Sequence, residues 1–406
     1  MRTLLVTTGS RGDVQPFLAL ARGLTDAGHG ALVAAPRRFA GLAAAIGVDF
    51  VGLDDSLFQL QDDLVGAGGW AAVTAVRRVK PFLRAWLEDL SQLADAAADA
   101  VVFTQKSLGG RSIAEKLKVP ALPAQLVPLT PPTAAFVNPV APALTPALLA
   151  RASWSLTDAV ELPWRGMVAQ WRSERLGLPA RVTPLSDVIA ANGILSAWSA
   201  HLLPAPPDWP KSARPLGFWT PPASDWQPPD ALQAFLDAGP APVLVGFGSM
   251  TTRDPAALTA EVGAGLRRAG RRGIIVAGWA GLGVGGAGDD VMVLDEAPYE
   301  SLLPLVAAVV HHGGIGTVGA ALRAGVPQVI HPFFGDQPFW ARQLQRLGVA
   351  PPPLRRLRAA DLAVALRATE GMAARAQQLG AVVRDEDGIT AARLRIEDLV
   401  RRPPAG

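Results

Sequence analysis

The chain has 406 residues, a length typical of two domains of about 200 residues each. Half of the residues are hydrophobic and 18% are charged, yet no apolar run reaches the roughly 18 residues of a membrane-spanning helix, so we expect a soluble protein. The absence of cysteine excludes disulfides, thiolate metal sites and a cysteine nucleophile, and a net charge of +3 on scattered basic residues argues against nucleic-acid binding.

The first segment predicts a strand, a loop, a helix and a second strand. Residues 3–8 form an apolar run, and the loop Gly-Ser-Arg-Gly-Asp follows at residues 9–13. Apolar residues then recur at helical spacing up to Gly28, which stands where a glycine is expected to end the helix. The loop has the character of a functional loop and not of a small-residue cleavage site, so we expect a cytoplasmic protein.

A second strand-helix-strand unit is predicted at residues 99–128, and this alternation is typical of a parallel sheet covered on both faces. Between about 130 and 190 the pattern weakens into helical segments that carry Trp154, Trp164 and Trp171. These tryptophans either line a variable pocket or belong to an ordinary core. Prolines fill residues 202–230, which we interpret as the interdomain linker.

The alternation restarts after the linker. Residues 242–250 predict a strand and loop, residues 255–269 a helix, and residues 273–278 and 291–298 two further strands. A short helix at 299–306 and a strand and loop at 307–314 follow. The predicted fold class is therefore α/β with two Rossmann-like β/α/β domains, and residues 388–402 form a last helix that can lie across either domain.

The turn "HHGGIGT" at residues 311–317 joins a short apolar strand to a helix that ends at Gly325. Backbone N–H groups of such a turn, together with the positive end of the helix, can bind a diphosphate. Glycines also form tight turns that bind nothing, and this alternative remains open. An imidazole at a helix start can donate a hydrogen bond to a phosphate oxygen, which favours the diphosphate interpretation.

The histidines do not predict a metal site. His311 and His312 are adjacent and point in different directions, and no carboxylate or histidine follows at the spacing of a helical zinc site. His331 lies on a predicted strand, where a hydrogen-bonded strand-end histidine is the expected role.

Residues 335–348 predict a helix with Pro338 in its first turn and Gly348 at its end. Asp336 is in position to cap this helix. A carboxylate followed by the amide of Gln337 also offers acceptors and donors to vicinal sugar hydroxyls. The two roles can coexist.

These motifs resemble those of the UDP-dependent glycosyltransferases of the GT-B fold. Residues 311–337 resemble the donor-binding signature in its bacterial form, "HHGG.GT…AG.PQ…P…DQ". The segments "TGSRGDVQPFLALARGL", "SLGGRSIAEKLKVPAL", "HLLPAPPDWP" and "GFGSM" resemble the bacterial sterol and antibiotic (glycopeptide, macrolide) glucosyltransferase branch. The resemblance runs from residue 1 to about 400, with the motifs in family order.

The resemblance implies a GT-B architecture, in which the parallel sheets of two Rossmann-like domains face a central cleft. Residues 1–215 would form the acceptor-binding domain and residues 216–385 the donor-binding domain. Residues 386–406 would form a C-terminal helix that can cross back to the N-terminal domain.

The resemblance also implies roles for residues of the donor site. The groups expected at the diphosphate are Ser249, His312, Gly314, Gly316 and Thr317. Asp336 and Gln337 match the pair that holds the donor hexose. Ser249 also fits a tight turn that touches no ligand. Many relatives carry a tryptophan where this chain has Glu296, so Trp279 is a substitute surface for the nucleobase or an ordinary core or loop residue.

For the general base, the resemblance points to Asp13, with Ser10 nearby. An acceptor hydroxyl loses its proton as it attacks the anomeric carbon, and a carboxylate can accept that proton. Asp13 also fits as a cap of the helix that begins at Val14. The plant branch uses a histidine in this region, but no histidine occurs between Met1 and Gly28.

The implied reaction is an inverting, metal-independent transfer of a hexose, glucose from UDP-glucose, to a hydroxyl of a lipophilic acceptor such as a sterol, polyketide or macrolide. No cofactor is implied besides this donor substrate. Two alternatives stay open: a nucleotide-sugar epimerase or hydrolase on the same fold, and a non-catalytic partner of another enzyme. UDP against dTDP, transient contact with a membrane surface and the oligomeric state also stay open.

Overall fold

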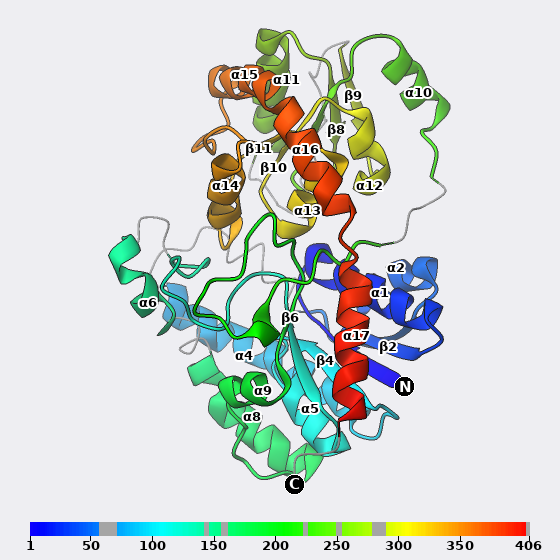
Figure 1. Cartoon of the computed structure of the whole chain (residues 1–406), viewed down its shortest axis with the longest axis vertical. Helices are drawn as coiled ribbons and strands as arrows, with labels where there is room; N and C mark the ends of the chain where they lie inside the picture. The colour runs from blue at the N-terminus through cyan, green and yellow to red at the C-terminus, as the bar shows by residue number, and fades with distance from the viewer. Residues whose placement is uncertain are drawn as a thin grey trace.

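The computed structural model describes residues 1–56, 71–141, 146–155, 161–221, 226–248, 254–277 and 290–402, without the side chains of residues 71–77. Each half of the chain forms its own parallel sheet, and the two halves lie one above the other in Figure 1. The predicted α/β class with two Rossmann-like domains is confirmed. Within these described ranges, no helix has the length and apolar character needed to span a bilayer.

The lower half holds a six-stranded sheet in the order β3-β2-β1-β4-β5-β6. All its paired strands run parallel, and β4 is buried along its whole length, as expected for a sheet covered on both faces. Its strands are β1 (Arg2–Val6), β2 (Gly30–Pro36), β3 (Asp49–Leu53), β4 (Ala100–Thr104), β5 (Ala121–Gln125) and β6 (Leu195–Ser196).

Helices cover both faces of this sheet. The helices of this half are α1 (Arg11–Asp26), α2 (Ala40–Ile46), α4 (Ala71–Leu90), α5 (Gly110–Leu117), α6 (Ala150–Ser153), α8 (Arg165–Trp171) and α9 (Leu185–Asn192). Successive strand residues point to opposite faces, so Leu5 packs with α1 and α2 while Leu4 and Val6 pack with α4, α5 and α8.

The tryptophans of the middle region belong to cores, which decides between the two interpretations of the sequence. Trp171 is buried in the cluster that joins α4 to the sheet, and Trp164 packs against the same cluster. Trp154 is buried beside Phe136, with 5.7 Å between the ring centroids.

The upper half holds a five-stranded sheet in the order β11-β10-β7-β8-β9, again with parallel pairs. Its strands are β7 (Val243–Val245), β8 (Gly273–Val276), β9 (Val291–Leu294), β10 (Ala308–His311) and β11 (Gln328–Ile330). The helices of this half are α10 (Asp230–Asp237), α11 (Pro255–Ala269), α12 (Tyr299–Leu302), α13 (Ile315–Ala324), α14 (Gln337–Arg346), α15 (Ala359–Ala368) and α16 (Ala373–Arg384).

The chain crosses between the halves twice, and the two crossings touch. Gly217 lies in the proline-rich segment, and Gly388 begins α17 (Gly388–Arg401). A Cβ on Gly388 would lie 2.6 Å from the carbonyl oxygen of Gly217, so the close approach requires glycine. From this point α17 runs down the lower half in Figure 1 and packs against α1.

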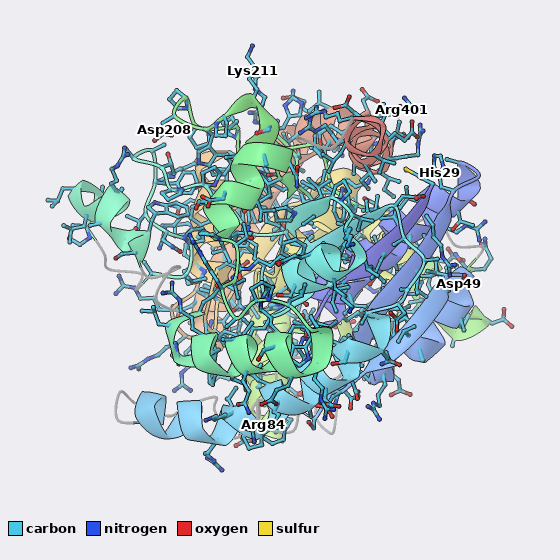
Figure 2. All side chains as sticks on the ribbon, turned by 90° about the horizontal axis from the view of Figure 1, so that it is seen from below. His29, Asp49, Arg84, Asp208, Lys211 and Arg401 are labelled. Atoms are coloured by element: carbon cyan, nitrogen blue, oxygen red, sulfur yellow. The ribbon has the colours of Figure 1, made fainter. Side chains whose placement is uncertain are left out.

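The ring of His29 anchors α17 to the lower half. Its Nε2 lies 3.0 Å from the carboxylate of Glu397, which also pairs with Arg393 and Arg401 of the same helix. Figure 2 shows His29 and Arg401 on the same side of the molecule, next to α17. Burial of Glu397 opposes its ionisation, but the hydrogen bond from His29 and the two arginines hold its pKa below the ordinary value.

Both sheets reverse their strand order at a point that faces the other half. In the lower sheet β2 and β3 lie on one side of β1, and β4, β5 and β6 on the other, so the reversal falls between β1 and β4. In the upper sheet it falls between β7 and β10. Ligands of open α/β sheets bind beyond the carboxyl ends of the strands at such a point.

Candidate active site

The start of α1 holds the carboxylate of Asp13 in a fixed position. The backbone N–H of Ser10 donates to Oδ2 at 2.9 Å, and the Ser10 hydroxyl donates to the same oxygen at 3.1 Å. Gly9 has φ of +119°, and a Cβ on it would overlap Oδ2. Asp13 therefore takes part in capping, but as the third residue of a helix that begins at Arg11, three residues before the predicted start at Val14; the N-cap residue is Ser10.

The second carboxylate oxygen of Asp13 pairs with Lys106, which the sequence analysis did not anticipate. The distance from Nζ to Oδ1 is 2.5 Å, although the two residues are 93 positions apart. Lys106 follows the end of β4, so both side chains lie at the reversal point of the lower sheet. Desolvation opposes the charged ammonium, but attraction to Asp13 and then to Asp336 outweighs it and raises the pKa of Lys106. Lys106 is therefore a cation at neutral pH.

At the end of β10, His311 shapes the glycine turn from inside the protein. Its ring is fully buried, and its Nδ1 accepts a hydrogen bond from the N–H of Gly313 at 3.1 Å. Nε2 therefore carries the proton and donates to Oε1 of Gln328 at 2.9 Å. Burial, and then the neighbouring His312, lower the pKa of His311 to about 3, so the ring is neutral.

The ring of His312 points in a different direction from that of His311, with 84° between the ring planes. Its Nδ1 is buried and has no hydrogen-bond partner among the described residues. Burial lowers the pKa of His312 to about 4, so the ring is neutral at neutral pH. A Cβ on Gly314 would overlap Nε2 of His312, which explains the glycine at that position. An unpartnered buried imidazole nitrogen at a helix start indicates a place for a ligand.

The start of α13 presents backbone N–H groups beside this ring. The first helical hydrogen bond runs from the N–H of Val318 to the carbonyl oxygen of Gly314, at 3.0 Å. The N–H groups of Gly316 and Thr317 come before it, at the positive end of the helix. A Cβ on Gly316 would lie 3.9 Å from the Cα of Gly12 in α1, so the two helix starts face each other across the junction.

Asp336 is the N-cap residue of α14, at the carboxyl end of the upper sheet, but its side chain makes no capping hydrogen bond, so the predicted capping role of its carboxylate is wrong. Its Oδ2 accepts a hydrogen bond from Nε1 of Trp340 at 2.7 Å. Burial raises the pKa of Asp336, and attraction to Lys106 partly offsets this effect. The carboxylate of Asp336, in the upper half, is thus attracted by the ammonium of Lys106, in the lower half.

Gln337 is buried and serves the loop before α14. Its Oε1 accepts hydrogen bonds from the N–H groups of Phe333, at 2.7 Å, and Phe334, at 3.2 Å. The amide oxygen therefore shapes the backbone that presents Asp336.

The remaining predicted residues lie at the edge of the described site or beyond it. Ser249 and Trp279 are outside the described residues. Glu296 is exposed after β9. His331 is a hydrogen-bonded histidine at the end of β11, as expected, with Nδ1 3.0 Å from the carbonyl oxygen of Leu354.

Two hollows flank Lys106 on the lower half. One, of about 270 Å³, is open to solvent and lined by Asp13, Lys106 and the turn that follows β5. Gln125 fixes that turn, because its Oε1 accepts from the N–H of Leu129 at 3.1 Å and its Nε2 donates to the carbonyl oxygen of Thr130 at 2.7 Å.

The second hollow has an apolar wall from α4. Phe82, Leu83 and Trp86 form that wall, and Lys106 lies at its rim. Trp154, Trp164 and Trp171 line neither hollow, so the apolar lining around Lys106 comes from α4 and from the turn after β5 and not from the tryptophan-rich region.

Two family descriptions match this chain. Residues 3–136 match the glycosyltransferase family 28 N-terminal domain, and residues 274–390 match the erythromycin biosynthesis protein CIII-like C-terminal domain. The first range covers α1 and Lys106, and the second covers α13 and Asp336.

Similar curated proteins include two sterol 3-beta-glucosyltransferases of Arabidopsis thaliana. One is 33% identical over 97% of this chain and 64% of its own length, and the other is 30% identical over 97% of this chain and 67% of its own length. The chain thus spans about two thirds of these plant relatives. Among solved structures, the calicheamicin glycosyltransferase CalG4 is 20% identical and superposes over both whole chains with a TM-score of 0.71, which shows a shared fold.

Proposed function

The chain belongs to the UDP-glycosyltransferases of the GT-B fold, and we propose that it transfers glucose from UDP-glucose to a hydroxyl of a lipophilic acceptor, with inversion. One observation carries this proposal: the fixed carboxylate of Asp13 and the amide turn of α13 lie on opposite sides of one junction. In this proposal, residues 1–215 bind the acceptor, residues 216–385 bind the donor, and residues 386–406 return to the first domain.

The start of α13 is the proposed diphosphate site. The N–H groups of Gly316 and Thr317 and the ring of His312 would donate to phosphate oxygens, with Gly314 leaving room for that ring. The unpartnered Nδ1 of His312 supports this assignment. A neutral imidazole acts here as a hydrogen-bond donor, and the helix end supplies the positive potential. Ser249 at the diphosphate and Trp279 at the nucleobase remain predictions from the family resemblance.

Asp336 is the proposed acceptor of hydrogen bonds from the hexose. Trp340 fixes one carboxylate oxygen, and a carboxylate can accept about four hydrogen bonds in total. A donor sugar without the bonded hydroxyls would leave this carboxylate unpaired, at a cost of about 1 to 3 kcal/mol. Gln337 supports the loop that presents Asp336 and adds an amide at the same place.

The proposed reaction is a single displacement. The acceptor hydroxyl donates its proton to Asp13 as its oxygen bonds to the anomeric carbon from the face opposite the diphosphate. The bond from that carbon to the diphosphate oxygen breaks, and UDP leaves with the electron pair. The helix start and His312 stabilise the negative charge that develops on UDP, so the mechanism needs no metal ion.

A lipophilic acceptor fits the apolar wall of α4. Phe82, Leu83 and Trp86 offer a surface for a ring system beside Lys106, which contacts Asp13. Both Arabidopsis relatives carry the name sterol 3-beta-glucosyltransferase, which supports an alcohol of sterol, polyketide or macrolide type. We further propose a cytoplasmic location, with transient contact at a membrane surface where such acceptors partition.

The direct test supplies UDP-glucose and a panel of sterols, macrolides and polyketide alcohols to the purified protein. Mass spectrometry of a product heavier by one hexose, and its anomeric configuration by NMR, would establish an inverting transferase. The Asp13→Asn variant serves as the control for catalysis. Consumption of UDP-glucose without an acceptor would instead support an epimerase or hydrolase, and binding of UDP without any turnover would support a non-catalytic partner.

A further inference from the structure

Lys106 lies where charges from both halves of the protein meet. Its ammonium is 2.5 Å from Oδ1 of Asp13 on the lower half, and it also attracts Asp336 on the upper half. It is the residue shared by the two hollows, one lined by Asp13 and the turn after β5 and one with the apolar wall of α4. No step of the proposed displacement uses this side chain.

The two carboxylates repel each other across the junction. Burial is the main cause that raises the pKa of Asp336; the negative charge of Asp13 adds a smaller effect in the same direction, and Lys106 acts against both. Like charges brought together in a partly desolvated site are costly, and a nearby cation reduces that cost. Lys106 therefore reduces the electrostatic cost of having the Asp336 carboxylate on the opposite side of the junction from Asp13.

Lys106 also completes the positioning of Asp13. Ser10 holds Oδ2 with two hydrogen bonds, and Lys106 holds Oδ1, so the carboxylate cannot rotate freely. The raised pKa of Lys106 keeps it protonated at neutral pH, which excludes Lys106 itself as the group that accepts the acceptor's proton.

We propose that Lys106 is a positioning residue for glucosyl transfer: its ammonium holds the proton-accepting carboxylate of Asp13 in place and attracts the sugar-binding carboxylate of Asp336, and so aligns the acceptor hydroxyl with the anomeric carbon. The inference rests on the proposed function. It adds that the alignment depends on the positive charge of Lys106 in the proposed acceptor domain, which attracts the Asp336 carboxylate in the proposed donor domain. A misplacement of about 1 Å between reacting groups can cost roughly a hundredfold in rate.

The test compares Lys106→Met with Lys106→Arg in the full-length protein. The Met variant should lower kcat by about 10-fold to 100-fold and weaken UDP-glucose binding several-fold, because the hexose contact with Asp336 is affected. UDP binding by calorimetry should stay within about twofold, since the proposed diphosphate site lies at α13. The Arg variant, which keeps the charge, should recover most of both losses.

Two further variants separate this role from general effects. Lys211→Met removes one positive charge from an exposed residue that Figure 2 shows far out on the surface, and it should leave kcat and both affinities unchanged. The double variant Lys106→Met with Asp336→Asn removes the cation together with one of the repelling carboxylates. Its loss in kcat should be smaller than the product of the two single losses. Lys106→Gln replaces the Met variant if the latter does not fold.

Different results overturn different statements. A Lys106→Met variant with wild-type kcat and wild-type UDP-glucose affinity overturns the positioning role while the transferase assignment stands. The same holds if Lys106→Arg is as impaired as Lys106→Met, or if the double variant loses activity multiplicatively. A wild-type protein that binds neither UDP nor UDP-glucose overturns the proposed function, and the positioning role falls with it.

Discussion

The starts of α1 and α13 occupy comparable places in their sheets, since each follows one of the two strands between which the order reverses. Their chemistry differs. At α1 the polar groups are charged side chains, Asp13 and Lys106, joined as an ion pair. At α13 they are backbone N–H groups and two histidines, His311 and His312, with pKa values lowered to about 3 and about 4.

The two domains therefore place a functional site at the same position of their sheets, and the residues at that position determine what the site does. The charged groups at the start of α1 can accept a proton, because a carboxylate can change its protonation state during a reaction. The neutral groups at the start of α13 can hold an anion, because their oriented dipoles stay the same over the physiological pH range. Changes at Asp13 and Lys106 should therefore affect mainly turnover, and changes at the start of α13 should affect mainly the binding of UDP.

The largest expected effect comes from Asp13→Asn at the start of α1. The amide keeps an oxygen for the hydrogen bonds from Ser10 but cannot accept a proton at neutral pH. We expect kcat to fall by roughly 10² to 10⁴, with UDP affinity unchanged by calorimetry. Undiminished transfer in this variant would remove Asp13 from the role of base.

The next largest effect is expected at Gly314, in the turn at the start of α13. In Gly314→Ala the new Cβ overlaps Nε2 of His312, so the ring must move. We expect UDP affinity to fall about 10-fold to 100-fold, or about 1.4 to 2.8 kcal/mol, with a native fold by circular dichroism.

Gly316→Ala is the matched variant in the same turn, because its Cβ meets only the Cα of Gly12, at 3.9 Å. It should leave the thermal stability of the unliganded protein unchanged. Any loss of UDP affinity in Gly316→Ala then measures how closely the diphosphate approaches that backbone. Equal UDP affinity in wild type and Gly314→Ala would contradict the assignment of the turn.

The junction that brings the two halves together depends on Gly388. A Cβ at this position would lie 2.6 Å from backbone atoms of Gly217 and Phe218. Gly388→Ala should therefore destabilise the protein by about 1 to 3 kcal/mol in urea unfolding, the usual cost of overpacking. Gly371→Ala is the control, because nothing lies within 4 Å of its Cβ position. Equal stability of the two variants would show that the crossing tolerates a side chain.

The smallest expected effect is the contribution of His312 to the free energy of unfolding at low pH. The pKa of His312 is about 4 in the folded protein, below the ordinary value of 6.5, so the unfolded chain takes up the proton first as pH falls. Stability is fully present above about pH 6.5 and is lost as pH falls toward 4. Between pH 6.5 and 5, wild type should lose about 1 to 2 kcal/mol more than His312→Phe in urea unfolding. The same acid loss in both proteins would mean that this ring is not held neutral by the fold.

Local signals made part of the fold predictable from the sequence. The helix at residues 255–269 was predicted with the bounds it has, because Asp254 and Pro255 mark its start and Gly270, with φ of +67°, marks its end. The two-residue strand β6 was not predicted, because so short a strand is defined by its pairing with β5 and carries no pattern of its own.

The site was predictable where one motif holds both partners and not where the fold joins distant residues. Ser10 and Asp13 lie three positions apart in one loop, so both could be named as candidates, although the expected helix cap was Asp13 and the N-cap residue is Ser10. Lys106 is 93 positions from Asp13, and only the pairing of β1 with β4 brings the two ends together. The adjacent histidines predicted different directions for the two rings, and the resemblance assigned His312 to the diphosphate, but nothing in the sequence indicated that the His311 ring would accept a hydrogen bond from Gly313 and support the turn.

A crystal structure with UDP bound would show whether the turn at the start of α13 is the diphosphate site. The account predicts diphosphate oxygens within hydrogen-bonding distance of the N–H groups of Gly316 and Thr317 and of the ring of His312, with the open phosphate end directed toward Asp13. UDP bound elsewhere, or a turn at α13 that stays free of phosphate in the presence of bound UDP, would contradict it.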